Sequence, residues 1–296
     1  MQDNITNFHL AGVVPVAGQS LDFNFPWHDS LQPIAQNYLA VERAVVECAY
    51  AGCDTIWIVC HNDMQPLIRH RLGEYVQDPV YLYRKYDVEP INENRKPIPL
   101  YYVPIHPNDR FKRDCLAWSV LYGAKASYYT CKQVSKWTAP NKYYVAFPYG
   151  VYDPKTLREH RKEIASDKGF LLSYCGKTVR DNEYLGFTFD SDDFIRYRKQ
   201  IREKGTGVKV PKQETESGEI PSKLLPLEER WSARFFSLDK IFGSAKIRGA
   251  EMVELPWYWN IGSWEGLREF LSSGDKIERP NKDLLSYHEY NKISCE

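Results

Sequence analysis

The chain has 296 residues with 39 basic and 39 acidic side chains, and 43% of its residues are hydrophobic. The zero net charge excludes a global basic field of the kind that draws proteins onto nucleic acid or anionic membranes. No signal peptide and no apolar run of membrane-spanning length is evident, so we expect a cytoplasmic protein without nucleic-acid or membrane partners. The seven cysteines are widely spaced, which is typical of reduced, buried thiols.

Strand and helix patterns alternate through the first half of the chain. Residues 8–17 read as a buried strand that runs into a loop, and residues 35–51 as a helix stopped by Gly52. Residues 54–60 form an apolar, β-branched run that is typical of a central parallel strand. The pattern continues with a helix (63–75), a strand (98–104), a helix with a glycine near its end (113–124), a strand (142–148) and a charged helix (154–166).

This alternation predicts an α/β fold with a doubly wound, mostly parallel sheet. Right-handed crossovers place the loops that follow the parallel strands at one edge of the sheet, where ligands bind in such folds. The second half predicts an antiparallel hairpin over 168–189 and a basic helix that begins after Asp190 and runs through Lys204. We expect a flexible surface loop over 205–223, which is polar and rich in Gly and Pro.

Helical patterning returns over residues 228–246, and a strand is expected over residues 251–259. Ser263 is expected to cap a helix that runs through Leu271. The prediction is one domain over residues 1–275, followed by a C-terminal tail over 276–296.

Four segments occur in an order that resembles one enzyme family: "LAGVVPVAGQ", "HDSLQPI", "YLAVERAVVECAYAGCDTIWIV" and "WYWNIGSWEGLREFL". They are similar to the sugar-1-phosphate nucleotidyltransferases, or sugar-nucleotide pyrophosphorylases, which have a GT-A-like Rossmann core. The resemblance covers residues 8–272 and implies a reaction of NTP with a sugar 1-phosphate, with Mg²⁺ as cofactor if the protein is active and no cofactor otherwise. It implies nucleotide contacts from Ala11, Gly12, Gly18, Gln19, Ser20 and Asp29, and metal contacts from Asp153 and Asn260.

The departures from the family pattern concern charge. The family's glycine-rich loop ends in Thr-Arg, whereas here no Arg or Lys occurs before Arg43, and Pro15 removes a backbone N–H. Asp29 stands near the place of a family lysine. One metal aspartate is replaced by Asn260, a poor Mg²⁺ ligand, and the other is displaced to Asp153. Losing one stabilising group can slow such a reaction about a hundredfold, so degenerate or altered chemistry is the favoured interpretation.

Two other classes of function stay open. A non-catalytic binding or structural protein would use the aromatic loops 23–27 and 257–259 as an interface with a protein partner. A glycosyltransferase would use Asp190 and Asp192 as a metal-binding D-x-D motif, although the same carboxylates are suited to capping the helix that follows. A nucleotide or sugar nucleotide is the expected ligand of either enzyme.

A histidine cluster is the best catalytic alternative among the residues that are present. His28-Asp29 and His61-x-Asp63 both follow strands at the expected ligand edge. Together they could form a small metal or acid–base site. The competing interpretation is that these histidines are hydrogen-bonded structural groups.

Overall fold

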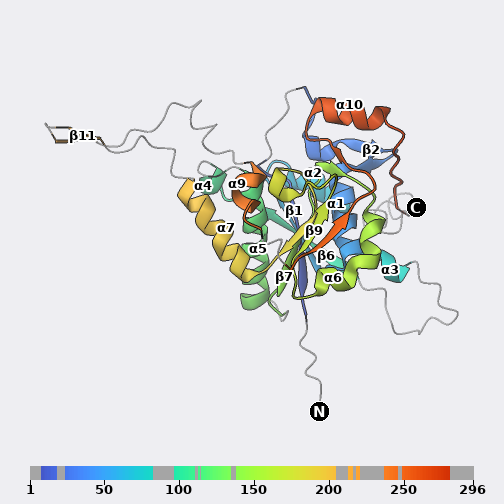
Figure 1. Cartoon of the computed structure of the whole chain (residues 1–296), viewed down its shortest axis with the longest axis horizontal. Coiled ribbons are helices and arrows are strands. Elements are labelled where there is room, and N and C mark those ends of the chain that lie inside the picture. Colours follow the sequence, from blue (N-terminus) through green and yellow to red (C-terminus); the bar gives the residue numbers. More distant parts are fainter. Residues whose placement is uncertain are drawn as a thin grey trace, which may run out of the picture.

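The computed structural model describes residues 8–18, 24–82, 97–110, 113, 115–134, 138–204, 213–215, 218–220, 237–245 and 249–280. Its main sheet contains β1 (Leu10–Pro15), β4 (Thr55–Cys60), β5 (Tyr75–Gln77), β6 (Pro97–Pro104), β7 (Lys142–Val145), β9 (Phe170–Ser173), β10 (Phe187–Phe189) and β13 (Glu251–Glu254). The eight strands lie in the order β13-β9-β10-β7-β1-β4-β6-β5. Figure 1 shows them at the centre of the molecule, between two groups of helices.

The sheet is mostly parallel, as predicted. β1 runs parallel to β4 and β7, and β4 runs parallel to β6. β10 is antiparallel to both β7 and β9, and β5 is antiparallel to β6. The predicted hairpin over 168–189 is therefore the β9–β10 pair. The predicted α/β fold class is confirmed.

Helices cover both faces of the sheet because its central strands bury side chains on both sides. One face carries α1 (Ala40–Ala51), α2 (Gln65–Leu72), the 3₁₀ helix η2 (Pro154–His160) and α6 (Arg161–Ala165). The other face carries α5 (Leu116–Gln133), α7 (Ser191–Lys204) and α9 (Leu238–Phe242). Along β1, Leu10 and Val14 enter the core under α1, whereas Ala11 and Val13 enter the core under α5.

The remaining described elements are short, apart from one C-terminal helix. They are η1 (Asp29–Leu31), β2 (Pro33–Ala35), β3 (Tyr38–Leu39), α3 (Pro79–Leu82), α4 (Pro107–Arg110), β8 (Gly150–Val151), η3 (Val179–Asp181), β11 (Gln213–Thr215), β12 (Gly218–Ile220), β14 (Trp259–Asn260) and α10 (Trp264–Ser272). Ser263 caps α10 as predicted, because its side chain accepts a hydrogen bond from the backbone N–H of Gly266.

The helix predicted over 35–51 begins later than expected. Asn37 adopts a left-handed conformation, with φ of 55°, and turns the chain between β2 and β3. The Glu42 carboxylate then accepts the N–H of Leu39 at 2.7 Å and caps α1. At the other end, Gly52 stops the helix as predicted, with φ of 87°.

The glycine in the helix predicted over 113–124 has a different role from the one expected. The helix continues through Gly123 to the end of α5, so this glycine is not a stop signal. A Cβ atom there would lie 2.7 Å from Val13 Cγ1 and 2.8 Å from Val59 Cγ2. Gly123 therefore lets α5 pack closely on β1 and β4.

Three predicted segments in the second half divide differently in the structure. The helix predicted over 154–166 is the 3₁₀ helix η2, capped by Asp153, followed by α6. The strand predicted over 251–259 is two strands, β13 and β14. The loop predicted over 205–223 contains the β11–β12 pair, and its other residues lie outside the described part. Within 228–246, the structure describes α9 and its flanks only.

The predicted boundary between residues 275 and 276 stays a prediction. Arg279 lies 3.5 Å from the buried carboxylate of Glu42, so the chain just beyond the boundary contacts the start of α1. Residues 281–296 lie outside the described part. Among the described helices, none is both long enough and apolar enough to cross a membrane.

The close packing of α5 leads to a stability prediction. Gly123→Ala is expected to lower the free energy of unfolding by about 1–3 kcal/mol, because the added methyl group has no space between the two valines. Helix propensity alone would make the alanine variant more stable by about 1 kcal/mol. A loss of stability would therefore show that the close packing outweighs helix propensity. Urea unfolding followed by circular dichroism measures it. The exposed substitution Lys125→Ala on the same helix is the control, expected within about 0.5 kcal/mol of wild type. A more stable Gly123→Ala protein would contradict this packing.

Candidate functional site

The loop that follows β1 has its backbone groups occupied within the protein. The N–H groups of Val16 and Ala17 both donate to the carbonyl of Val59, at 2.8 and 2.9 Å. The Tyr149 hydroxyl donates to the carbonyl of Val16 at 2.8 Å, and the Ser119 hydroxyl donates to that of Ala17 at 2.5 Å. Phosphate loops instead direct successive free N–H groups at the ligand. This part of the loop is therefore organised for packing.

The glycines and the alanine predicted to contact a nucleotide serve the core. A Cβ at Gly12 would lie 2.9 Å from Cys48 Sγ, and one at Gly18 would lie 2.4 Å from the backbone carbon of Cys115. Gly18 also has a φ of 84°, which favours glycine. Ala11 is fully buried under α5. Gln19, Ser20 and Phe23 lie outside the described residues, so the predicted nucleotide contacts stay predictions.

Aromatic side chains fill the position where the strand order reverses. In doubly wound sheets the ligand crevice opens between the carboxyl ends of the two strands that flank this point, here β1 and β7. Phe147 and Tyr149 follow β7, and both are fully buried. The ring centroid of Tyr184 lies 5.9 Å from that of Phe147 and 5.4 Å from that of Tyr149. The crevice is thus packed with rings at this point.

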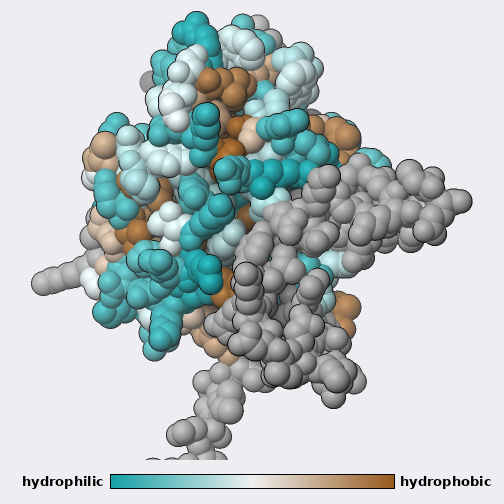
Figure 2. Space-filling view, turned by 90° about the vertical axis from the view of Figure 1, so that its right-hand side faces the viewer, coloured by the Kyte–Doolittle hydropathy of each residue, from teal (hydrophilic) through white to brown (hydrophobic). Residues whose placement is uncertain are grey.

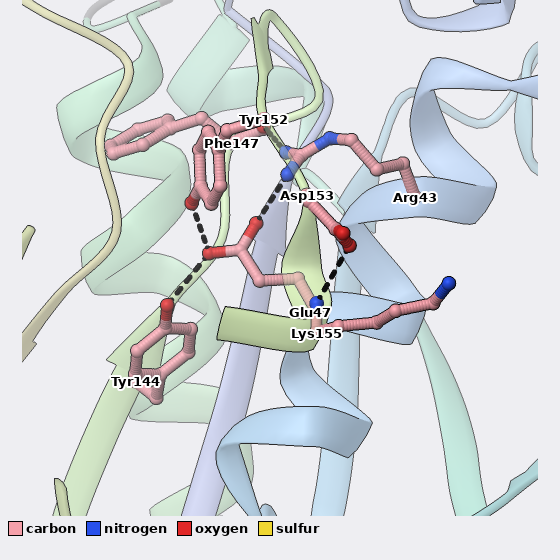
Figure 3. Close-up of polar contacts among 7 residues, drawn as sticks. All are labelled: Arg43, Glu47, Tyr144, Phe147, Tyr152, Asp153 and Lys155. Carbon is pink, nitrogen blue, oxygen red and sulfur yellow. Dashed lines mark hydrogen bonds and ion pairs between the residues drawn. The ribbon is translucent and has the colours of Figure 1, made fainter. Parts of the chain in front are cut away.

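A buried ion pair lies next to Phe147 (Figure 3). Arg43 and Glu47 are one turn apart on α1, and both side chains are completely inaccessible to solvent. Arg43 donates to Glu47 at 2.8 Å and to the carbonyl of Phe147 at 2.5 Å. Glu47 also accepts hydrogen bonds from the hydroxyls of Tyr144 and Tyr152. The first cation of the chain is therefore neutralised inside the protein.

This network links α1 to the segment that follows β7. The Arg43 guanidinium also lies 4.6 Å from the centre of the Tyr152 ring, a cation–π contact. The sequence identifies Arg43 as the first cation of the chain, but its pair with Glu47 is not among the sequence predictions. The available signal was an Arg and a Glu four residues apart in a helix whose one other charged residue is Glu42, in its first turn.

The two predicted metal positions lie in neighbouring segments, but their donor atoms are used locally. β14 pairs with β8, which places Asn260 opposite Gly150. The Asn260 side-chain oxygen accepts the N–H of Gly262 at 3.0 Å. Asp153 accepts the N–H of Lys155 at 3.0 Å and so caps η2. Together they offer one carboxylate and one neutral amide, and the amide is a poor Mg²⁺ ligand, so the predicted metal contacts stay predictions.

No other metal centre is evident in the described part of the chain. No group of three or more His, Cys, Asp or Glu side chains there is arranged to hold a metal ion.

The candidate D-x-D motif lies at the opposite edge of the sheet. Asp190 follows β10, which runs antiparallel to β7, so it lies beside the start of β7 and not at the carboxyl ends of the parallel strands. Its carboxylate accepts the N–H of Asp193 at 2.8 Å at the beginning of α7. Asp192 is exposed within the first turn of this helix. The geometry matches helix capping.

The histidine cluster does come together in space. The Nδ1 atom of His28 lies 3.3 Å from the Asp29 carboxylate and accepts the N–H of Ser30 at 3.2 Å, which caps η1. Burial, together with the nearby His61 and against the attraction of Asp63, lowers the pKa of His28 to about 4. His28 is therefore neutral at physiological pH and acts as a structural cap. Asp29 is almost fully buried, and its predicted nucleotide contact stays a prediction.

Comparisons with known proteins support the fold. No protein-family model and no curated protein sequence matches the chain. A provisionally named glucose-1-phosphate thymidylyltransferase from Bacillus anthracis, solved with sucrose, has a similar structure with a TM-score of 0.53. The alignment covers 91% of this chain and 98% of that chain at 10% identity. This likeness establishes a nucleotidyltransferase-like fold and does not address activity.

Two other solved structures are more distant. One is Rv0371c from Mycobacterium tuberculosis, with a TM-score of 0.47 and 12% identity over 90% of this chain and 100% of that chain. The other is a nucleoside-diphosphate-sugar pyrophosphorylase from Vibrio cholerae, with a TM-score of 0.46 and 14% identity over 88% of this chain and 100% of that chain.

The buried ion pair yields a second stability prediction. Arg43→Met is expected to lower the free energy of unfolding by about 3–5 kcal/mol, because it leaves the Glu47 carboxylate buried without a cation. Adding Glu47→Leu should recover part of this loss, since the double variant holds no buried charge. Arg71→Met is the matched control, because its partner Glu42 retains Arg279. Equal losses for Arg43→Met and Arg71→Met in urea unfolding would contradict this account.

His28 predicts a pH dependence of stability. Its pKa is about 4 in the folded protein and 6.5 when unperturbed, so between these values the unfolded chain binds more protons. Stability should fall as the pH drops from 6.5 to 4, by on the order of 1 kcal/mol per pH unit from this group. His28→Asn keeps a cap at η1 but cannot titrate, so its stability should depend less on pH than that of wild type. The free energy of unfolding of both proteins is measured by urea unfolding at pH 5 and pH 7. An equal change between the two pH values in wild type and His28→Asn would exclude this contribution.

Proposed function

We propose that this protein is a non-catalytic binding protein on a nucleotidyltransferase-like scaffold. The observation that supports this most strongly is that Arg43, the first cationic residue of the chain, is used inside the core. Residues 1–42 contain no Lys or Arg, and Arg43 is buried and neutralised by Glu47. Nucleotidyl transfer requires cations or metal at the phosphates, where the charge of the transition state develops.

The surrounding geometry supports the same proposal. The backbone donors of Val16 and Ala17 are used by Val59, and Tyr149 bridges β7 to the β1 loop. The side-chain oxygen of Asp153 caps η2, and that of Asn260 accepts a hydrogen bond from the nearby N–H of Gly262. On this proposal, the backbone groups of the β1 loop serve packing and do not bind the phosphates of a nucleotide.

The aromatic loops offer the binding surface. The Phe25 and Trp264 rings meet edge to face with centroids 5.8 Å apart, so the loop before η1 packs on α10. Trp27 and Trp264 remain 49% and 46% exposed. Figure 2 shows hydrophobic residues among hydrophilic ones on the upper part of the molecule, where α10 lies in Figure 1. Exposed tryptophans are enriched among the energetically dominant residues of protein interfaces, so a protein partner is the proposed ligand.

A nucleotide titration tests the proposal. The full chain is titrated by calorimetry with the common NTPs and with UDP- and GDP-sugars, with and without Mg²⁺, and pyrophosphate release is assayed with sugar 1-phosphates. We expect no Mg²⁺-dependent tightening and no pyrophosphate release.

The contrary outcome is Mg²⁺-dependent binding that is lost in Asp153→Asn. Asparagine can still cap η2, so this variant removes the charge and keeps the local fold. Such a result would favour an active, Mg²⁺-dependent nucleotidyltransferase over a non-catalytic binding protein. Asp181→Asn, at the capped turn η3, is a matched control in which binding should not change.

A further inference from the structure

Helices α5 and α7 lie side by side on one face of the sheet (Figure 1). Tyr143 of β7 interacts with Ser127 and Tyr128 on α5. Its ring also stacks on that of Phe189, with centroids 5.0 Å apart, and Phe189 in turn meets the ring of Tyr197 on α7. The C-terminal half of α5 therefore lies beside the first two turns of α7.

The outward face of α5 carries two tyrosine–lysine pairs. The ammonium group of Lys125 lies 5.9 Å from the ring centre of Tyr129. That of Lys132 lies 5.4 Å from the ring centre of Tyr128 and donates to its hydroxyl at 3.3 Å. The two rings meet edge to face, with centroids 5.8 Å apart. These contacts hold both ammonium groups in place, so less side-chain freedom is lost when an anion binds them.

Both lysines lie on the flank of α5 that faces α7. Tyr128 is on this flank, because it interacts with Tyr143 of β7. Lys125 and Lys132 are three and four residues away from Tyr128, so helix geometry places them on the same side.

The facing flank of α7 is basic as well. Gln200 donates to Ser244 at 3.0 Å, on the chain that leads to the edge strand β13, so Gln200 lies on the flank of α7 that is remote from α5. Arg198 and Arg202 are each two residues from Gln200. At about 100° per residue, this spacing places both on the opposite flank, toward α5. Both side chains are exposed.

The two flanks together form a basic strip, defined as Lys125, Lys132, Arg198 and Arg202. Within the described part of the chain, these four side chains form no salt bridge. Helix α5 contains no Asp or Glu. Two acids on α7 are neutralised within that helix. The pairs are Asp193–Arg196 at 2.6 Å and Glu203–Lys199 at 3.8 Å. The other acids, Asp190 and Asp192, lie at the first turn of α7, at one end of the strip.

Exposed apolar side chains accompany the basic strip. Ile195 on α7 is 66% exposed, Tyr129 is 47% exposed, and Val134 at the end of α5 is 82% exposed. Aliphatic side chains gain little from the phosphates of a nucleic acid, whereas they can be buried against the apolar side chains of a peptide. An anionic membrane fits less well, because the apolar stripe of α7, with Tyr197 and Ile201, is buried in the core.

We propose that the basic strip binds an acidic segment of a partner protein, whose carboxylates meet the four cations and whose apolar side chains pack on Ile195 and the two tyrosines. This surface shares no residue with the exposed tryptophans or with the β1 loop. Its test is therefore independent of the proposed function.

A peptide of Glu-Glu-Leu repeats is the probe. It is labelled with fluorescein and titrated with the full chain, and binding is followed by fluorescence anisotropy. Gln-Gln-Leu repeats lack the charge, Glu-Glu-Ser repeats lack the apolar side chains, and an oligothymidine of similar length represents nucleic acid. We expect saturable, salt-sensitive binding of the Glu-Glu-Leu peptide, and binding at least about fivefold weaker for each of the other three.

Variants then locate the site. The double variants Lys125→Gln/Lys132→Gln and Arg198→Gln/Arg202→Gln should each weaken peptide binding at least about fivefold, through loss of two charges. All four residues are exposed, and glutamine has a helix propensity close to that of Lys and Arg, so the fold should be retained. Arg158→Gln, an exposed change in η2 on the opposite face of the sheet, is the matched control and should have no effect.

Four results would overturn the proposal. They are absent or non-saturable binding of the Glu-Glu-Leu peptide, equal binding of either altered peptide, unchanged affinity in both double variants, and tighter binding of the oligothymidine. The last result would assign the strip to nucleic acid instead.

Discussion

The Arg43 guanidinium in α1 has to be neutralised within the core, and the arrangement around the β1–β7 junction follows from this requirement. Glu47 supplies the charge from the same helix. Tyr144 from β7 and Tyr152 from the segment after β8 complete the hydrogen bonds of that carboxylate. Because a half-satisfied buried charge is strongly destabilising, α1, β7 and the following segment are held together as one unit.

That unit explains why the ligand edge is closed at the point where the strand order reverses. Arg43 binds the carbonyl of Phe147, which fixes the chain just after β7. Tyr149 then reaches the carbonyl of Val16 in the loop after β1. The Tyr149 hydroxyl and the rings of Phe147, Tyr149 and Tyr184 occupy the place where a doubly wound sheet usually opens to a ligand. The fold resembles that of nucleotidyltransferases, while these contacts serve packing, and fold alone does not determine function.

The glycines illustrate how one residue type can serve two purposes. A glycine-rich segment after a strand indicates a phosphate loop, because glycine allows backbone to approach a ligand closely. Here Gly12 and Gly18 allow close approach to Cys48 and Cys115 instead. The pattern of small residues is the same in both cases, and the identity of the group that approaches depends on the tertiary structure.

The sequence by itself determined the α/β class, the central strands and most helix positions, because hydrophobic periodicity and caps such as Gly52 and Ser263 act locally. It also showed that residues before Arg43 carry no cation. Only the tertiary structure decided what Arg43 does, which edge Asp190 occupies and why Gly123 lies inside a helix. Each of these depends on contacts between residues far apart in the chain: Arg43 with Phe147, β10 with β7, and Gly123 with Val13. Local patterns carry no information about such contacts.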